Sequence, residues 1–118
     1  MKLKMYGYPK CSTCRAAAKS LQSKGHELDT TDVFDTPPSA KELGHIIKQS
    51  GLDMKKFFNT SGEVYREMGL KDKLASMTPA EQLKLLSTNG RLIKRPIVTD
   101  GTKVTVGYKE QQYEEIWG

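Results

Sequence analysis

The chain contains two cysteines, Cys11 and Cys14, which are separated by only two residues and lie close to its amino-terminal end. A disulfide between them would close a very short loop and would therefore add little to the stability of the fold. A structural zinc site needs four ligands, and His26 and His45 are neither close together nor at zinc-finger spacing. We therefore expect redox chemistry at this pair, with no metal and no other cofactor.

The cysteine pair lies where a strand pattern gives way to a helix pattern. Residues 2–6 alternate between polar and apolar side chains, which predicts a strand, and residues 7–9 (Gly-Tyr-Pro) end it. From Cys14 onward, apolar residues recur at positions i, i+3, i+4 and i+7, which predicts a helix that ends at Gly25. Cys11 is thus expected at the amino terminus of this helix, with Cys14 one turn further on its apolar face.

Three later segments are predicted to complete a sheet and its helices. A second strand is expected within residues 27–34, before a pair of prolines. Residues 97–99 and 103–106 flank an Asp-Gly pair, which predicts a β-hairpin. A final amphipathic helix is expected around Tyr113 and Trp117.

Between these segments, residues 39–89 carry helical signals and almost no strand signals. Two pairs of residues have the spacing of a capping box: Ser39 with Glu42, and Thr78 with Glu81. A shorter helix, capped by Ser61 and ending at Gly69, is expected between the two helices that these boxes begin.

The predicted order of elements is β-α-β, a helical block, and β-β-α. This order, with a Cys-x-x-Cys motif near a βαβ pattern, is typical of the thioredoxin-like fold. A length of 118 residues corresponds to one domain. We therefore predict a single α/β domain over residues 1–118, with a thioredoxin-like part (1–36 and 90–118) and an inserted all-helical subdomain (37–89).

The expected place of Cys11 suits thiol chemistry. The reactive species is the thiolate, whereas a free cysteine with a pKa of about 8.5 is mostly protonated at neutral pH. Unpaired N–H groups and the helix dipole stabilise an anion at a helix amino terminus, so we expect Cys11 to be the nucleophile. Cys14 is expected to be the resolving thiol that attacks a mixed disulfide on Cys11. The alternative is that Cys14 serves only as a small core residue.

Charge and hydropathy limit the classes of partner. Lys and Arg outnumber Asp and Glu by 19 to 14, but the basic residues are dispersed, so we expect no direct binding of nucleic acid. No apolar run approaches the roughly 18 residues of a membrane span, and residues 1–10 lack the apolar core of a signal peptide. We expect a cytoplasmic monomer that does not bind membranes.

Further motifs are found at residues 8–15 (YPKCSTCR), 58–70 (FNTSGEVYREMGL), 92–98 (LIKRPIV) and 106–108 (VGY). With them, nearly the whole chain resembles the arsenate reductase, Spx and MgsR family (ArsC-like) of thioredoxin-like proteins. The resemblance implies that Pro96 is a cis-proline that faces the reactive cysteine and contacts the substrate. It also implies that the adjacent Arg95 helps to hold an anion or a thiolate.

Members of this family are either arsenate reductases coupled to glutaredoxin or redox-sensing transcription regulators that bind RNA polymerase. The reductases hold the oxyanion with three arginines, which the resemblance places at Asn59, Arg95 and Tyr108, so only Arg95 is retained here. The resemblance also implies that the reductases have a single reactive cysteine, at the position of Cys11, and no second cysteine at the position of Cys14. The regulators carry the Cys-x-x-Cys motif but usually extend beyond the final helix, a tail that we do not expect here.

These departures favour a thiol-disulfide oxidoreductase in which Cys11 and Cys14 form a redox-active disulfide and Arg95 takes part in catalysis. Its expected partners are a thiol or disulfide substrate or a low-molecular-weight thiol, with thioredoxin or glutaredoxin as the reductant. Two alternatives stay open: a glutaredoxin-coupled arsenate reductase, and an Spx-like redox-sensing regulator that binds RNA polymerase.

Overall fold

In the computed structural model, which describes residues 2–118, the chain forms two compact units. The first unit combines the residues up to Asp32 with Arg95–Gly118, and the second is the continuous segment Val33–Lys94. The first unit contains β1 (Lys2–Gly7), α1 (Ser12–Ser23), β2 (Glu27–Asp32), β3 (Ile97–Thr99), β4 (Val104–Val106) and α6 (Glu110–Trp117). Both cysteines therefore belong to the first unit.

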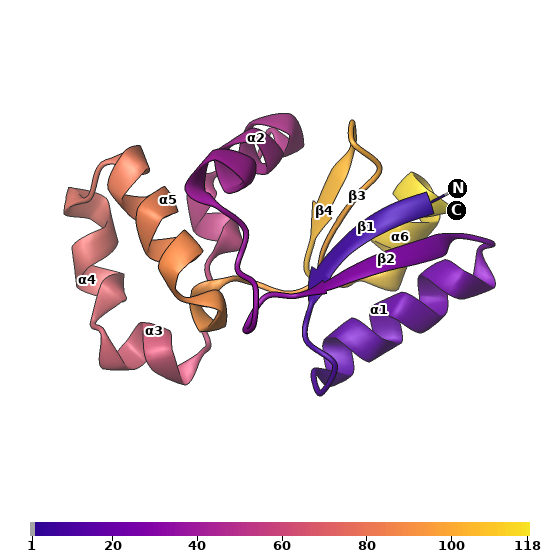
Figure 1. The fold of residues 1–118 in the computed structure, drawn as a ribbon, viewed down its shortest axis with the longest axis horizontal. Helices are drawn as coiled ribbons and strands as arrows, with labels where there is room; N and C mark the ends of the chain where they lie inside the picture. The colour runs from indigo at the N-terminus through magenta and orange to yellow at the C-terminus, as the bar shows by residue number, and fades with distance from the viewer. Residues whose placement is uncertain (1) are drawn as a thin grey trace. The chain divides into compact units, whose positions relative to one another are not determined.

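The first unit is built on a mixed sheet of four strands in the order β2-β1-β3-β4 (Figure 1). Strand β1 runs parallel to β2 and antiparallel to β3, and β3 pairs antiparallel with β4. In this register Met5 lies between Thr30 on β2 and Val98 on β3. The β-α-β and β-β-α order confirms the predicted thioredoxin-like arrangement, and the cysteine motif follows the carboxyl end of a central strand.

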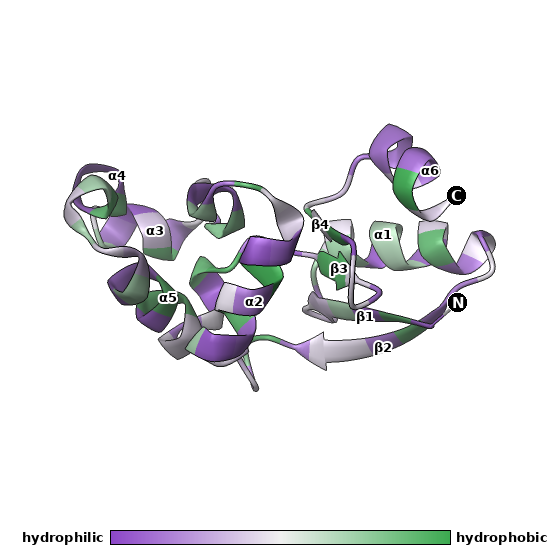
Figure 2. Cartoon of the chain, turned by 90° about the horizontal axis from the view of Figure 1, so that it is seen from above, coloured by the Kyte–Doolittle hydropathy of each residue, from purple (hydrophilic) through white to green (hydrophobic). Residues whose placement is uncertain are grey.

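Helices α1 and α6 pack against one face of this sheet and lie side by side (Figure 2). The buried side chains of this core come from both helices and from the two central strands: Leu3, Met5, Cys14, Ala17, Leu21, Val98, Tyr113 and Trp117. The indole Nε1 of Trp117 donates a hydrogen bond to Thr105 Oγ1 at 3.1 Å, so the polar atom of this buried ring is satisfied. Cys14 is thus a core residue as well as a member of the motif.

The second unit is helical, as the sequence predicts. It contains α2 (Ala40–Ser50), η1 (Met54–Phe57), α3 (Glu63–Glu67), α4 (Leu70–Lys73), η2 (Leu74–Ser76), α5 (Pro79–Thr88) and η3 (Gly90–Leu92). Ser39 Oγ accepts the backbone N–H of Glu42 at 3.1 Å and so caps α2. Thr78 and Glu81 bond each other's backbone amides and form the predicted capping box of α5.

Two details between these helices differ from the sequence prediction. Ser61 does not cap α3: the helix begins after Gly62, whose own N–H donates to the Asn59 carbonyl at 3.0 Å in a preceding turn. Gly69, with φ of 63°, ends α3 as expected, but the chain resumes at once in α4. The buried side chain of Leu70 holds this extra turn in the core of the helical unit.

None of the helices within residues 2–118 has the length and apolar character that a membrane crossing requires. The helix that carries the cysteine motif, α1, has 12 residues, against about 20 for a typical transmembrane helix.

Candidate active site

Cys11 is the residue that caps the amino terminus of α1. Its backbone is extended, with φ of −82° and ψ of 115°, and its N–H donates to the Tyr8 carbonyl at 3.0 Å. Its Sγ accepts the backbone N–H of Cys14 at 3.3 Å. The first N–H groups of a helix have no partner within the helix, so the sulfur takes the place that a Ser or Asp oxygen occupies in an ordinary cap.

This environment favours the thiolate of Cys11. Burial alone would raise its pKa, because desolvation disfavours the charged form. Hydrogen bonds from the Cys14 thiol and the Cys14 amide, together with the hydrogen bond and positive charge of Arg95, outweigh burial and lower the pKa of Cys11 below its ordinary value. The structure therefore brings together Cys11, Cys14 and Arg95, three of the residues expected at the site.

Cys14 has the opposite electrostatic environment. Only 4% of its surface is exposed, and it packs in the core between α1 and the sheet. Burial, followed by its hydrogen bond to Cys11, raises the pKa of Cys14 to about 12. Gly7 makes room for the thiol, because a Cβ at this position would lie 3.2 Å from Cys14 Sγ. Both cysteines are free thiols in this structure.

Arg95 and Pro96 form the connection into β3. The peptide bond between them is cis, and the Pro96 carbonyl accepts the N–H of Gly107 at 2.9 Å. Pro96 is buried, and the side chain of Arg95 is partly exposed while interacting with Cys11. Sequence spacing alone could not pair Arg95 with Cys11, because the contact joins opposite ends of the chain.

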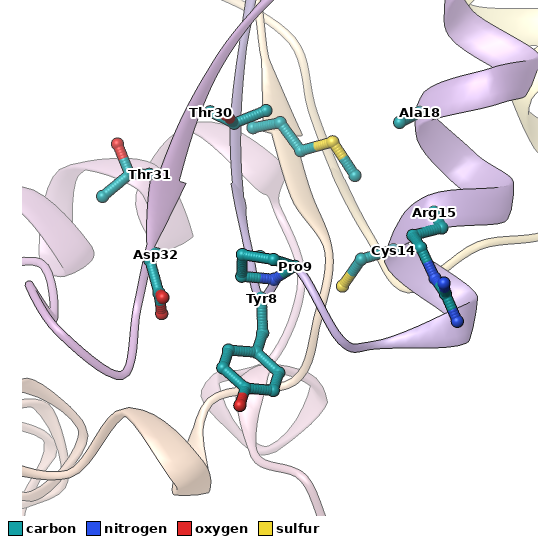
Figure 3. Close-up of a pocket in the computed structure, with 10 residues that line it drawn as sticks. Tyr8, Pro9, Cys14, Arg15, Ala18, Thr30, Thr31 and Asp32 are labelled. Atoms are coloured by element: carbon teal, nitrogen blue, oxygen red, sulfur yellow. The ribbon is translucent and has the colours of Figure 1, made fainter.

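A groove on the other side of Cys14 was not predicted from the sequence. It has a volume of about 300 Å³ and lies between α1 and the edge strand β2 (Figure 3). The lining residues come from β1, the turn after it, α1 and β2: Met5, Gly7, Tyr8, Pro9, Cys14, Arg15, Ala18, Thr30, Thr31 and Asp32. Cys14 therefore lines this groove, whereas Cys11 does not.

A cluster of polar side chains between α1 and α6 is likewise not predicted by the sequence. Glu110 Oε1 accepts hydrogen bonds from Ser20 at 2.6 Å and from Tyr108 at 2.8 Å, and Oε2 lies 2.7 Å from Lys24 Nζ. Lys24 also pairs with Glu114 at 3.0 Å. The Lys24 hydrogen bond, followed by those of Ser20 and Tyr108, lowers the pKa of Glu110 to about 2. Tyr108 is therefore bonded to an anionic carboxylate.

The two histidines and Asn59 have other surroundings within their own units. His26 is bound through Nε2 to the Trp117 carbonyl at 2.5 Å, whereas His45 is exposed on α2 in the second unit. Asn59 also belongs to the second unit, in the turn before α3. Within residues 2–118, no three His, Cys, Asp or Glu side chains are grouped so that they could hold a metal ion.

Comparison with known proteins places these features in a family. A sequence model of the ArsC family matches residues 6–116. The uncharacterized protein YusI of Bacillus subtilis is 56% identical over 117 residues, which cover 99% of each chain. An arsenate reductase of Haemophilus influenzae is 32% identical over 98% of this chain and 99% of its own.

Regulators are also among the relatives: the regulatory protein MgsR of Bacillus subtilis is 28% identical over 90% of this chain and 82% of its own. The crystal structure of an ArsC-family-related protein from Bacteroides fragilis superimposes with a TM-score of 0.91 at 46% identity, covering 98% of this chain and 97% of that one. The match of the family model to nearly the whole chain, together with this agreement in fold, shows that the protein belongs to the ArsC family.

Proposed function

We propose that this ArsC-family protein is a thiol-disulfide oxidoreductase that uses Cys11 and Cys14 as its redox pair. The observation that carries the proposal is the opposite environment of the two thiols. Cys11 caps α1 and has a lowered pKa, whereas Cys14 lies in the core and has a raised one. A nucleophile needs thiolate character at neutral pH, whereas a resolving thiol attacks only after the mixed disulfide has formed and does not need to be ionised before then.

The reaction has two exchange steps. In the first, the Cys11 thiolate bonds to one sulfur of a substrate disulfide, the substrate S–S bond breaks, and the second substrate sulfur leaves with the electron pair and takes up a proton. In the second, Cys14 loses its proton and attacks Cys11 Sγ, and the first substrate sulfur leaves as a thiol. Two electrons pass from the protein dithiol to the substrate, and thioredoxin, glutaredoxin or a small thiol returns them.

Arg95 and Pro96 have distinct roles in this proposal. Arg95 stabilises the Cys11 thiolate by a hydrogen bond and by its charge. Pro96, which has no backbone N–H, directly precedes β3 and would offer the substrate sulfur an apolar contact. Neither residue has to bind an oxyanion for disulfide exchange to proceed.

Arsenate reduction is the second candidate, because a relative that is 32% identical is an arsenate reductase. The local charges argue against efficient turnover. Asn59 and Tyr108 supply no positive charge, and Tyr108 is bonded to the anionic Glu110. Each missing charge-assisted contact to the oxyanion costs about 1.5 to 3 kcal/mol, or roughly one to two decades in affinity.

A regulator that binds RNA polymerase is the third candidate. The observation that favours it is the presence of MgsR and of the global transcriptional regulator Spx 1 of Lactococcus lactis among the relatives. In that case oxidation of Cys11 and Cys14 would serve as a switch and the protein would turn over no substrate.

The redox pair can be tested by oxidation and by turnover. Mass spectrometry after mild oxidation is expected to find an intramolecular disulfide, seen as the loss of two hydrogens. The reduced protein is expected to reduce a model disulfide in the presence of thioredoxin or glutaredoxin, and Cys11→Ser abolishes this activity. Thr13→Ala, in the exposed first turn of α1, is the matched control and retains it. Cys14→Ser is expected to accumulate the mixed disulfide on Cys11.

The same assays separate the three candidates. We expect arsenate turnover near background even with glutaredoxin and glutathione, and a rise in the Asn59→Arg, Tyr108→Arg double variant. Efficient arsenate turnover by the unmodified chain would contradict the proposal. Absence of both activities, together with tight binding to RNA polymerase, would favour the regulator.

A further inference from the structure

The two thiols of the motif open to different surroundings. Cys11 interacts with Arg95, whereas the groove between α1 and β2 is lined by Cys14. In Figure 3 the Cys14 sulfur points away from α1 toward Pro9 and Tyr8. We propose that low-molecular-weight monothiols enter this groove and reduce the Cys11–Cys14 disulfide by attacking the sulfur of Cys14. The inference rests on the proposed function, because it requires the disulfide to form.

The size and walls of the groove suit a small thiol. Its volume of about 300 Å³ is at the lower end of the range for small-molecule pockets, and a folded protein does not fit in it. Ala18 forms part of the α1 wall, and Thr30 and Thr31 form the β2 wall. Gly7 also lines it, and because a Cβ there would lie 3.2 Å from Cys14 Sγ, the glycine leaves room for a small molecule beside this buried sulfur.

The groove also leads to Cys14, and attack on the Cys14 sulfur releases Cys11, which is the better leaving group of the two. Exchange is faster when the thiol that leaves has the lower pKa. Attack on Cys14 expels Cys11, whose thiolate is stabilised by the Cys14 amide and by Arg95. Attack on Cys11 would instead expel Cys14 as a thiolate into the core of the first unit. Access and leaving-group stability therefore favour the same sulfur.

The proposed reduction balances with two monothiols. In the first step a thiolate RS⁻ bonds to Cys14 Sγ, the protein S–S bond breaks, and Cys11 leaves with the electron pair. In the second step another RS⁻ attacks the R sulfur of the mixed disulfide, RS–SR forms, and Cys14 leaves and takes up a proton. The protein gains two electrons and the monothiols are oxidised to one disulfide. Cys14 is a poor leaving group, which slows the second step, whereas the freed Cys11 thiolate re-forms the protein disulfide by expelling RS⁻. The mixed disulfide on Cys14 is therefore expected to be captured when an alkylating agent blocks Cys11.

The position of the adduct is the direct test. Oxidised protein is mixed with 2-mercaptoethanol, quenched after short times with excess N-ethylmaleimide, and fragmented by mass spectrometry. We expect the mercaptoethanol adduct on Cys14 and the maleimide on Cys11. The reverse distribution at the earliest times would overturn the inference while leaving the redox pair intact. Failure of the protein to form any disulfide would instead refute the proposed function.

Filling the groove is the second test. Ala18→Leu, which adds bulk to the α1 wall, is expected to slow reduction by 2-mercaptoethanol about tenfold, because access to the attacked sulfur is lost. Ala16→Leu, on the exposed side of the same helix, is the matched control and leaves the rate unchanged. Alkylation of reduced Cys11 by iodoacetamide is expected to be equal in both variants, which shows that the motif itself is intact.

A variant on the β2 wall keeps the test valid if Ala18→Leu on α1 fails to fold. Thr30 is an exposed residue of the edge strand, so Thr30→Tyr narrows the groove without entering the core. It is expected to slow reduction by 2-mercaptoethanol in the same direction as Ala18→Leu. Unchanged reduction rates in both folded variants would overturn the inference.

Discussion

Removal of Arg95 provides the sharpest test of how the site activates Cys11. The Cys11 sulfur accepts the Cys14 amide at 3.3 Å and also interacts with the Arg95 guanidinium. Arg95→Ala removes the charge and a hydrogen bond but leaves the helix cap in place. The pKa of Cys11 is therefore expected to rise toward its ordinary value, because one of the groups that stabilise the thiolate is gone.

The magnitude follows from the partial exposure of the site. A hydrogen bond to a charged group contributes about 1.5 to 3 kcal/mol, and screening by solvent at a partly exposed site reduces this to about 1 kcal/mol. At a pH where Cys11 is still mostly protonated, a loss of this free energy in Arg95→Ala lowers the fraction of Cys11 present as thiolate about fivefold. The thiolate that remains is a stronger nucleophile by about twofold, because nucleophilicity rises with the pKa of the thiol.

The assay is the pH dependence of alkylation of Cys11 by iodoacetamide in the Cys14→Ser background. The two effects predict that Arg95→Ala reacts about two to three times more slowly than its parent at low pH, and about twice as fast at high pH where both are ionised. The two rate profiles are thus expected to cross. Lys94→Ala, which removes a neighbouring exposed cation, is the matched control and should not produce the crossing. Superimposable profiles for Arg95→Ala and its parent would refute the role given to Arg95.

Two further predictions concern stability. The pKa of Glu110 in the folded protein is about 2, below the usual value of about 4.3, so the ionised carboxylate stabilises the fold fully above pH 4.3 and this stabilisation is lost as the pH falls toward 2. Thermal melts between pH 5 and pH 2 should therefore show a smaller decrease in melting temperature for Glu110→Gln than for the unmodified protein. Equal decreases would contradict this prediction. Gly90→Ala would place a Cβ 1.9 Å from the Val33 carbonyl oxygen, so urea unfolding is expected to detect a loss of about 3 kcal/mol. Gly44→Ala, whose Cβ would meet only the tip of Leu83 at 3.3 Å, should cost far less.

Sequence spacing predicts the parts of this molecule that depend on near neighbours. The strand before the motif, the helix after it and the capping residues Ser39 and Thr78 all follow from periodicity and from pairs three or four residues apart. The place of Cys11 at the helix start follows for the same reason. The error at Ser61 has a local cause, since the turn that Gly62 closes onto the Asn59 carbonyl still includes Ser61, and the helix begins one residue later than a Ser61 cap would place it.

The rest of the site depends on contacts between distant segments. Only the family resemblance relates Arg95 to Cys11 at the level of sequence, because no local pattern connects the two residues. The bond between Tyr108 and Glu110 is local, but its partners Ser20 and Lys24 come from another helix. The groove beside Cys14 requires the parallel pairing of β1 with β2 and the packing of α1 against β2, and sequence spacing predicts neither of these contacts.

The first unit is made from two chain segments that are separated by the whole of Val33–Lys94. On the ribosome, β1 and α1 emerge first, whereas β3, α6 and Arg95 emerge only after the helical unit. Until then the apolar face of α1 has no partner from α6, and the nascent Cys11 lacks the guanidinium that lowers its pKa. The contribution of Arg95 to thiol reactivity is therefore acquired only at the end of synthesis, and a truncated chain that ends before residue 95 carries the motif and its helix cap without the guanidinium.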